Sequence, residues 1–120
     1  MKLSTGIDLI EIERVNSVIE RHGERFLNRI FTPRELQDCA GRSESLAARF
    51  AAKEAAAKAL GCGIGDISWQ EVEVQRAENG QPRLHLTGKA KQFAKEQGFV
   101  QWSVSLSHSQ NHAIAMVVLL

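Results

Sequence analysis

The chain has 120 residues, of which 43% are hydrophobic and 24% charged, and its formal net charge is +1. These values are ordinary for a globular protein, and this length supplies one hydrophobic core rather than two, so we expect a single domain over residues 1–120. The near-neutral charge argues against nucleic acid or an anionic membrane as a partner of the whole molecule. No apolar run approaches the roughly 20 residues of a membrane span.

The N-terminal sequence MKLSTGIDLIEIERV has acidic residues too early for the apolar segment of a signal peptide. The two cysteines, Cys39 and Cys62, are not in a CxxC arrangement. This pattern predicts free, structural thiols in a reducing compartment. We therefore expect a cytoplasmic protein.

The first third of the chain predicts a strand followed by helices. β-Branched residues around Gly6 predict a strand that ends near residues 8–10. Apolar residues that recur every three or four positions predict an amphipathic helix over residues 11–22, closed by Gly23. A short helix or an extended turn follows over residues 23–31.

Two further helices are predicted before the middle of the chain. The motif FTPREL contains a capping threonine, a first-turn proline and a glutamate that completes a capping box. We expect this short helix to end at Gly41. A second start, at Ser43 or Ser45, leads into a long alanine-rich helix that stops at Gly61.

The second half of the chain predicts mainly strands. Alternating residues in SWQEVEVQ and RLHLTG predict two strands joined by the turn ENGQP. A helix over KAKQFAKEQ, opened by Thr87 or Gly88 and ended by Gly98, precedes two final strands, WSVSLSHS and HAIAMVVL. We therefore predict an α+β fold, with an antiparallel sheet packed against the long alanine-rich helix and shorter helices. The apolar end AMVVLL is expected inside the sheet or at a subunit contact.

The alanine-rich helix contains the first candidate site. Glu54 and Lys58 lie one turn apart on one side of it, and Arg49 and Lys53 form a second such pair. Solvent-exposed pairs at this spacing are common and weak, so spacing alone favours a structural interpretation. The abundance of alanine, however, indicates close packing against another surface, which would leave these charges beside a crevice.

Asp8 is the second candidate, because it lies among apolar residues in a predicted strand. An unpaired carboxylate there is costly, so it needs a partner or a metal. The alternative is that Asp8 caps the following helix. Asp8 and Glu54 together supply two hard oxygen ligands, which is how proteins usually hold Mg²⁺ beside substrate phosphates. The isolated cysteines, His108 and His112 do not have zinc-type spacing.

Three other features are ambiguous by themselves. The loop GCGIGD follows a helix, so it fits a helix stop and a flexible turn better than a phosphate-binding loop. The hydroxyls and imidazole of SLSHSQNHA are either ordinary polar residues or contacts for phosphate and ribose oxygens. Arg14 and Arg21 share a helical face, with Arg25 beyond it. This face is either solvated and balanced by Glu13 and Glu20, or a docking surface for an acidic partner.

The order of these features resembles holo-[acyl-carrier-protein] synthase, the short, single-domain class of the 4′-phosphopantetheinyl transferase family. The motifs are GIDLIEIERV, RFAAKEAAAKALGCGIG and SLSHS, and the similarity extends over essentially the whole chain. It implies transfer of the 4′-phosphopantetheine arm from coenzyme A to a serine of an apo-acyl carrier protein. It further implies Mg²⁺ as cofactor, release of 3′,5′-ADP, and a homotrimer with active sites at subunit interfaces.

The resemblance also implies roles for individual residues. Asp8 and Glu54 bind Mg²⁺, while Glu54 and Lys58 are catalytic, with Lys58 near the diphosphate. We expect Glu54 to accept the serine proton through a water molecule near the metal. The implied contacts with coenzyme A are Arg49, Lys53, Lys58, Gly61, Gly63 and His108. The implied contacts with the carrier protein are Arg14, Arg21 and Arg25. Cys62 departs from the family pattern, which often has a hydroxyl residue at this position.

Two alternatives remain open. A non-enzymatic module that binds an acidic protein or a nucleotide explains why seven of the nine arginines lie between Arg14 and Arg49. It leaves Asp8 and the pair of Glu54 and Lys58 unexplained. A different Mg²⁺-dependent phosphotransferase would use the same charged residues on another diphosphate.

Overall fold

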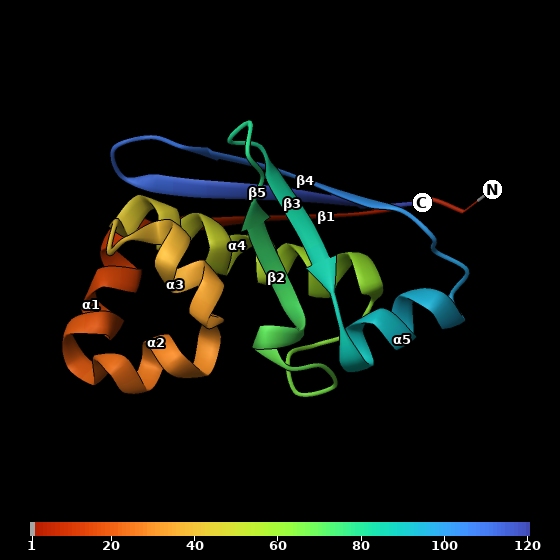
Figure 1. The fold of residues 1–120 in the computed structure, drawn as a ribbon, viewed down its shortest axis with the longest axis horizontal. Helices are drawn as coiled ribbons and strands as arrows, with labels where there is room; N and C mark the ends of the chain where they lie inside the picture. The colour runs from red at the N-terminus through yellow and green to blue at the C-terminus, as the bar shows by residue number, and fades with distance from the viewer. Residues whose placement is uncertain (1) are drawn as a thin grey trace.

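The computed structural model describes residues 2–120, in which one long helix lies between two antiparallel sheets and is flanked by shorter helices (Figure 1). The larger sheet has the order β1 (Ser4–Glu11), β5 (His112–Leu119), β4 (Trp102–His108). The smaller sheet is a hairpin of β2 (Val72–Arg76) and β3 (Pro82–Leu86). The helical elements are α1 (Ile12–His22), α2 (Glu24–Ile30), α3 (Pro33–Cys39), α4 (Ser43–Leu60), the 3-10 turn η1 (Trp69–Glu71) and α5 (Gly88–Glu96). The predicted α+β fold is confirmed.

The long helix α4 occupies the centre of the molecule. The larger sheet covers one side of it and the β2–β3 hairpin crosses it on another, while α1, α2 and α3 gather at one end (Figure 1). α5 lies at the opposite end, close to both termini (Figure 1). Within the described residues, no helix combines the length and the apolar character needed to cross a bilayer.

The strand β1 packs directly on α4 because Gly6 has no side chain. A Cβ atom at Gly6 would lie 1.9 Å from the carbonyl oxygen of Ala55 and 2.9 Å from the amide nitrogen of Ala59. The hydroxyl of Ser4 also donates a hydrogen bond of 2.6 Å to the carbonyl oxygen of Ala59. Since side chains on a strand alternate between faces, Asp8 shares the face of Gly6 and is directed toward α4.

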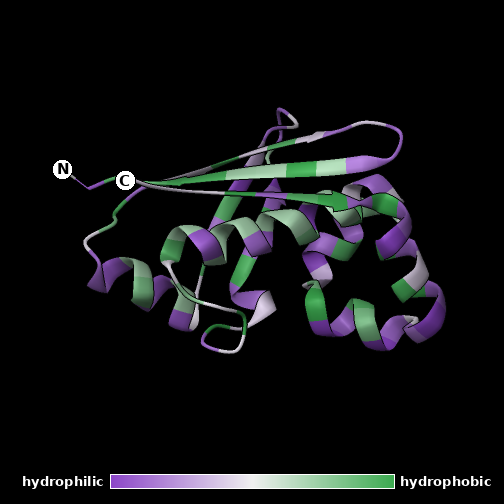
Figure 2. Cartoon of the chain, turned by 180° about the vertical axis from the view of Figure 1, so that it is seen from behind, coloured by the Kyte–Doolittle hydropathy of each residue, from purple (hydrophilic) through white to green (hydrophobic). Residues whose placement is uncertain are grey.

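The strand β5 is the central strand of the larger sheet, so the predicted interior position of AMVVLL is confirmed. Val117 and Leu119 are fully buried, whereas Met116, the residue before Val117, is 44% exposed. The hydrophobic colour in Figure 2 runs along β5, with the pale, alanine-rich α4 beside it. One face of the sheet therefore forms the core with α4, and the other face carries apolar side chains that are exposed in the single chain.

Local signals explain most element boundaries. The amide of Glu35 donates to Oγ1 of Thr32, and the amide of Thr32 donates to Oε1 of Glu35, which forms the predicted capping box of α3. Gly61 ends α4 in the left-handed conformation, with φ of 74°. Residues 23–31 mostly form the short helix α2, rather than an extended turn.

Two predicted boundaries are wrong. Residues 69–71 form the turn η1 instead of the first part of a strand, so β2 begins at Val72. The carboxylate of Glu71 accepts a hydrogen bond of 2.7 Å from the amide of Ser68, which stabilises a turn where the alternating sequence predicted a strand. In addition, α3 is terminated by Ala40, which has a φ of 49°, one residue before Gly41.

Replacement of Gly6 with alanine is expected to lower the free energy of unfolding by about 1–3 kcal/mol or more, because the new methyl group overlaps the backbone of α4. Chemical denaturation followed by circular dichroism measures this loss. The matched control is Gly63→Ala, whose Cβ would meet only a carboxylate oxygen of Asp66 at 4.0 Å. Equal stability of the two variants would contradict the close packing of β1 on α4.

Candidate functional site

Asp8 and Glu54 line the same cleft, which we call the acidic cleft. It has a volume of about 380 Å³. Its lining residues are Asp8, Leu9, Ile10, Arg14, Val15, Val18, Phe26, Phe50 and Glu54. The strand β1 thus contributes one carboxylate and α4 contributes the other, while α1 and α2 supply most of the remaining wall. The predicted pair of acidic residues, 46 positions apart in the chain, is brought together by the packing of β1 on α4.

Lys58 lies beside this pair of carboxylates. Its Nζ donates hydrogen bonds of 3.0 Å to Oδ1 of Asp8 and 3.0 Å to the carbonyl oxygen of Ile7. The side chain of Lys58 is 56% exposed, so its ammonium group is accessible to a ligand. The structure therefore gathers Asp8, Glu54 and Lys58, the three residues predicted for metal binding and catalysis.

The electrostatics of the acidic cleft favour a bound cation. Partial burial raises the pKa of Glu54, the negative charge of Asp8 raises it further, and Lys58 opposes both effects. A divalent ion would relieve the repulsion between the two carboxylates, whose hard oxygen atoms suit Mg²⁺. Among residues 2–120, no group of three or more His, Cys, Asp or Glu side chains could hold a metal ion. The two carboxylates therefore fit an ion that takes its other ligands from substrate and water, as Mg²⁺ usually does.

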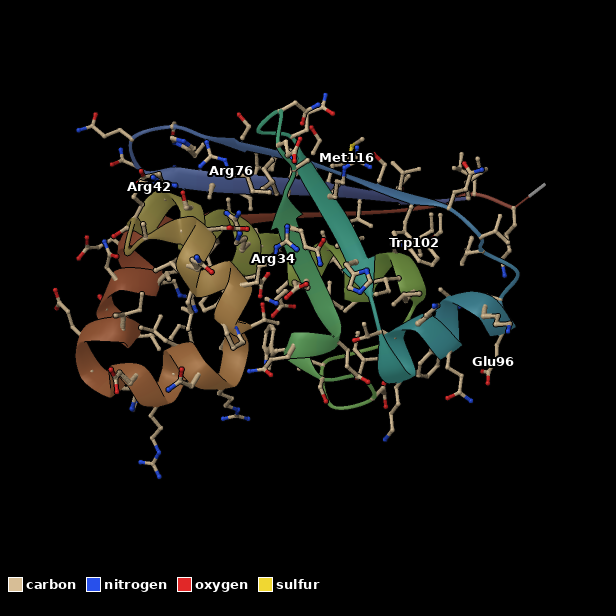
Figure 3. All side chains as sticks on the ribbon, in the orientation of Figure 1. Arg34, Arg42, Arg76, Glu96, Trp102 and Met116 are labelled. Atoms are coloured by element: carbon tan, nitrogen blue, oxygen red, sulfur yellow. The ribbon has the colours of Figure 1, made fainter. Side chains whose placement is uncertain are left out.

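A second cleft, which we call the basic cleft, lies between α4 and the β2–β3 hairpin and has a volume of about 320 Å³. Its lining residues are Arg42, Ser45, Arg49, Arg76, Gly80, Pro82 and Leu106. Arg42 and Arg76 extend from different elements at the same end of the molecule (Figure 3). Arg49 is only 7% exposed, and within the described residues its Nε has no hydrogen-bond partner. A buried N–H group without an acceptor is costly, and a bound anion would supply the missing acceptor.

The other residues predicted to contact coenzyme A fall in two places. His108 is exposed on β4, two residues after Leu106 of the basic cleft and therefore on the same face of the strand. Gly61 and Gly63 lie in the loop that follows α4 and line neither cleft. The amide of Gly63 already donates a hydrogen bond of 3.1 Å to Oδ2 of Asp66.

Lys53 requires a correction, because it lies in neither cleft. Its side chain is fully buried, and its Nζ donates to Oε1 of Glu35 at 2.7 Å and to the carbonyl oxygens of Trp69 and Val72 at 3.0 and 2.6 Å. Burial lowers the pKa of Lys53, and the charge of Glu35 opposes this shift. All three protons of the ammonium group are used inside the protein, so this geometry does not support the implied contact with coenzyme A. The regular spacing was misleading because α4 is buried on most of its surface.

The predicted docking arginines lie on a surface that begins at the acidic cleft. Arg14 lines that cleft, and Arg21 is exposed further along α1. Arg25 lies in a neighbouring hollow of about 380 Å³ lined by His22, Arg25, Phe26 and Arg29. Since Phe26 lines both the hollow and the acidic cleft, the two surfaces are continuous.

Several site residues were missed by sequence analysis. Phe26 and Phe50, whose rings lie 6.3 Å apart, line the acidic cleft together with Glu54, and the ring of Phe50 stacks on that of Trp69 at 5.0 Å. In the sequence they are indistinguishable from ordinary core residues. Arg76 lines the basic cleft because the β2–β3 hairpin packs beside α4, and no local sequence pattern identifies it as a site residue.

The two cysteines are free, as predicted. Burial raises the pKa of Cys39 to about 11, and it also raises the pKa of Cys62. Both shifts disfavour the reactive thiolate. The thiols therefore have no evident part in the chemistry of either cleft.

Two carboxylates beside an ammonium group, with an arginine-lined cleft nearby, are typical of enzymes that act on phosphorylated substrates with a divalent cation. The family model of the 4′-phosphopantetheinyl transferase superfamily matches residues 4–117. The holo-[acyl-carrier-protein] synthases of Herpetosiphon aurantiacus and Dehalococcoides mccartyi strain 195 are 51% and 53% identical, each over 97% of both chains. The crystal structure of Helicobacter pylori holo-[acyl-carrier-protein] synthase with coenzyme A has a TM-score of 0.88 and 32% identity, and the match covers 97% of this chain and 99% of that one.

The chain therefore belongs to the 4′-phosphopantetheinyl transferase superfamily, in its class of holo-[acyl-carrier-protein] synthases, and it is an enzyme. The match leaves only short ends of the chain uncovered. Both the acidic cleft and the basic cleft lie within the matched residues.

Replacement of Glu54 with glutamine is expected to stabilise the ligand-free protein at neutral and alkaline pH. Because the pKa of Glu54 is raised, the folded state binds this proton more tightly than the unfolded state, so stability falls as the carboxyl ionises. The gain should be complete above the raised pKa and vanish below the ordinary pKa of glutamate. Thermal unfolding across this pH range measures it, and a gain that is independent of pH would contradict the assigned repulsion.

The same variant tests the fit to a metal. Added Mg²⁺ is expected to raise the melting temperature of the wild-type protein, with a stabilisation of about 2.7 kcal/mol when its concentration is 100 times Kd. The Glu54→Gln protein should show little of this effect. Equal stabilisation of both proteins would place the ion elsewhere.

Proposed function

We propose that the enzyme transfers the 4′-phosphopantetheine arm of coenzyme A to a serine of an apo-acyl carrier protein, with Mg²⁺ as cofactor and 3′,5′-ADP as the second product. The observation that carries the proposal is the meeting of Asp8, Glu54 and Lys58 in one cleft, at the positions of the family motifs. The coenzyme A bound to the H. pylori relative supports the choice of donor. We place this reaction in the cytoplasm, in fatty acid biosynthesis and lipid metabolism.

The residues of the acidic cleft have distinct roles in this reaction. Asp8 and Glu54 would hold Mg²⁺, which when bound neutralises charge that develops on the diphosphate oxygens. Lys58, with its ammonium group held beside Asp8, donates to a phosphate oxygen and stabilises the same charge. Glu54 accepts the serine proton through one water molecule.

The basic cleft is the proposed site of the 3′-phosphate of coenzyme A. The planar guanidinium of arginine matches phosphate oxygens in a bidentate geometry. Arg49 has a buried Nε without a partner, and Arg42 and Arg76 line the same cleft. His108, on the face of β4 that borders this cleft, is proposed to contact the same end of the coenzyme.

A homotrimer with shared active sites is part of the proposal. The acidic and basic clefts have no lining residue in common, so a neighbouring subunit could bring its basic cleft to the acidic cleft of the first. The outer face of the larger sheet supports such an assembly. Ile7, Leu9 and Met116 on that face are 55%, 62% and 44% exposed, and a contiguous apolar surface of this kind is typical of subunit interfaces.

Incubation of the protein with coenzyme A, Mg²⁺ and an apo-acyl carrier protein, followed by mass spectrometry, tests the proposed activity. We expect covalent addition of the arm to the carrier protein and release of 3′,5′-ADP. Lys58→Ala should lower kcat by roughly 10²–10³, as does removal of comparable charge-stabilising donors. Lys89→Ala, at an exposed lysine on α5, is the matched control.

The same assay separates the alternatives. A wild-type protein that binds the carrier protein or the nucleotide without modifying the carrier would be a binding module. Turnover of another diphosphate, with an unmodified carrier protein, would indicate a different phosphotransferase. Either result would reject the proposed function.

Replacement of Arg14 with alanine is expected to raise the KM for the acyl carrier protein by up to about fivefold, the effect of one exposed ion pair. The salt dependence of this KM should become weaker, because a rim charge acts mainly on association. The KM for coenzyme A should not change. Arg83→Ala, at an exposed arginine on β3, is the control, and a carrier-protein KM that is unchanged in Arg14→Ala would remove the docking role.

A further inference from the structure

The outer edge of β2 is bound by side chains rather than by another strand. In a two-stranded sheet, alternate residues direct their backbone groups toward the partner strand, and the others direct them outward. In β2, the residues with outward groups that have partners are Val72, Val74 and Arg76. The carbonyl of Val72 and the amides of Val74 and Arg76 are bound by side chains of α3 and α4, which lie along the open edge of the hairpin.

Two carboxylates of α3 accept hydrogen bonds from this edge. Oε2 of Glu35 accepts from the amide of Val74 at 2.9 Å, and Oδ2 of Asp38 accepts from the amide of Arg76 at 3.2 Å. Glu35 and Asp38 are three residues apart, so they share one face of the helix. α3 therefore binds the outward amides of Val74 and Arg76, in place of a neighbouring strand.

Lys53 links the same edge to α4. Glu35 is fully buried, so its negative charge needs a compensating partner, and Nζ of Lys53 lies 2.7 Å from its Oε1. The same ammonium group donates a hydrogen bond of 2.6 Å to the carbonyl oxygen of Val72. The buried pair thus ties both helices to the strand.

This edge ends in the basic cleft. Arg76 is the last residue of β2, and Arg49 lies one turn before Lys53 on α4. Both arginines line the cleft. The position of one guanidinium relative to the other is therefore governed by the hydrogen bonds that hold β2 against α3 and α4.

We propose that Glu35 and Asp38 are positioning residues for the anion site, because their carboxylates hold β2 so that Arg49 and Arg76 converge on one phosphate group. The inference rests on the proposed binding of the 3′-phosphate in the basic cleft. The charge of a carboxylate has the opposite effect, since a carboxylate near an anion site weakens anion binding by repulsion. The hydrogen bond from the Arg76 amide to Asp38 must therefore outweigh the charge of Asp38.

Asp38 offers a direct test, because its side chain is 21% exposed and its loss leaves the buried pair intact. Asp38→Asn removes the charge but keeps a carbonyl oxygen that can accept from the Arg76 amide, whereas Asp38→Ala removes both. Isothermal titration calorimetry with 3′,5′-ADP and with 5′-AMP gives two Kd values. The Kd for 5′-AMP divided by the Kd for 3′,5′-ADP measures the contribution of the 3′-phosphate, and we call this value the ratio.

We expect Asp38→Ala to lower this ratio by about threefold or more, the effect of one lost hydrogen bond. Asp38→Asn should keep the wild-type ratio or increase it. If the charge alone mattered, both variants would increase the ratio. A folded Asp38→Ala protein with the wild-type ratio or a higher one would overturn the inference.

The double variant Glu35→Gln/Lys53→Met tests the buried end of the edge. It removes both charges together, so that neither is left without its partner. The ratio is expected to fall in this protein but not in Phe99→Leu, a core variant that removes none of these hydrogen bonds. An equal fall in both proteins would mean that the ratio follows general stability, and this would overturn the inference for Glu35.

Failure of the inference can be distinguished from failure of the proposed function. A wild-type protein that binds both nucleotides equally, yet transfers the arm, would reject the 3′-phosphate site and the positioning role with it. The wild-type protein could instead prefer 3′,5′-ADP but fail to transfer the arm, while Asp38→Ala loses this preference and Asp38→Asn keeps it. That result would reject the proposed function and support the positioning role.

Discussion

The candidate site depends on the direct contact between β1 and α4. A Cβ atom on Gly6 would lie 1.9 Å from a backbone oxygen of the helix, so only glycine permits the observed packing. Asp8, two residues later on the same face, then shares a cleft with Glu54. One turn along α4, Lys58 contacts Asp8. The contact of two backbones, rather than the reach of long side chains, therefore creates the group of charges to which the chemistry is assigned.

The helix α4 contacts the sheet, the two clefts and the core through different sets of residues. Its alanines accept β1 and β5, Glu54 and Lys58 border the acidic cleft, and Arg49 borders the basic cleft. Lys53 points into the core, where Glu35 balances its charge. This arrangement explains why residues 49–58 of this alanine-rich helix contain three cations and one carboxylate. Each charge has a separate environment, and alanine elsewhere lets the sheet and the hairpin approach closely.

Local sequence signals predicted the parts of the structure that local interactions determine. The capping box at Thr32 and the helix stop at Gly61 are examples, and the spacing of Glu54 and Lys58 correctly placed them on one side of α4. The failures arise where tertiary contacts decide. Lys53 has the same spacing from Arg49 but is buried, because a hairpin distant in sequence covers it. The position of Arg76 in the basic cleft likewise follows from the docking of that hairpin, which no short pattern encodes.

A crystal structure of the protein with coenzyme A and Mg²⁺ tests the central claim most directly. The account predicts one ion that is coordinated by carboxylate oxygens of both Asp8 and Glu54, at the short distances of about 2.0–2.1 Å that Mg²⁺ requires, and by oxygens of the diphosphate. An ion bound elsewhere, with these two carboxylates separated and solvated while the coenzyme is in place, would contradict it.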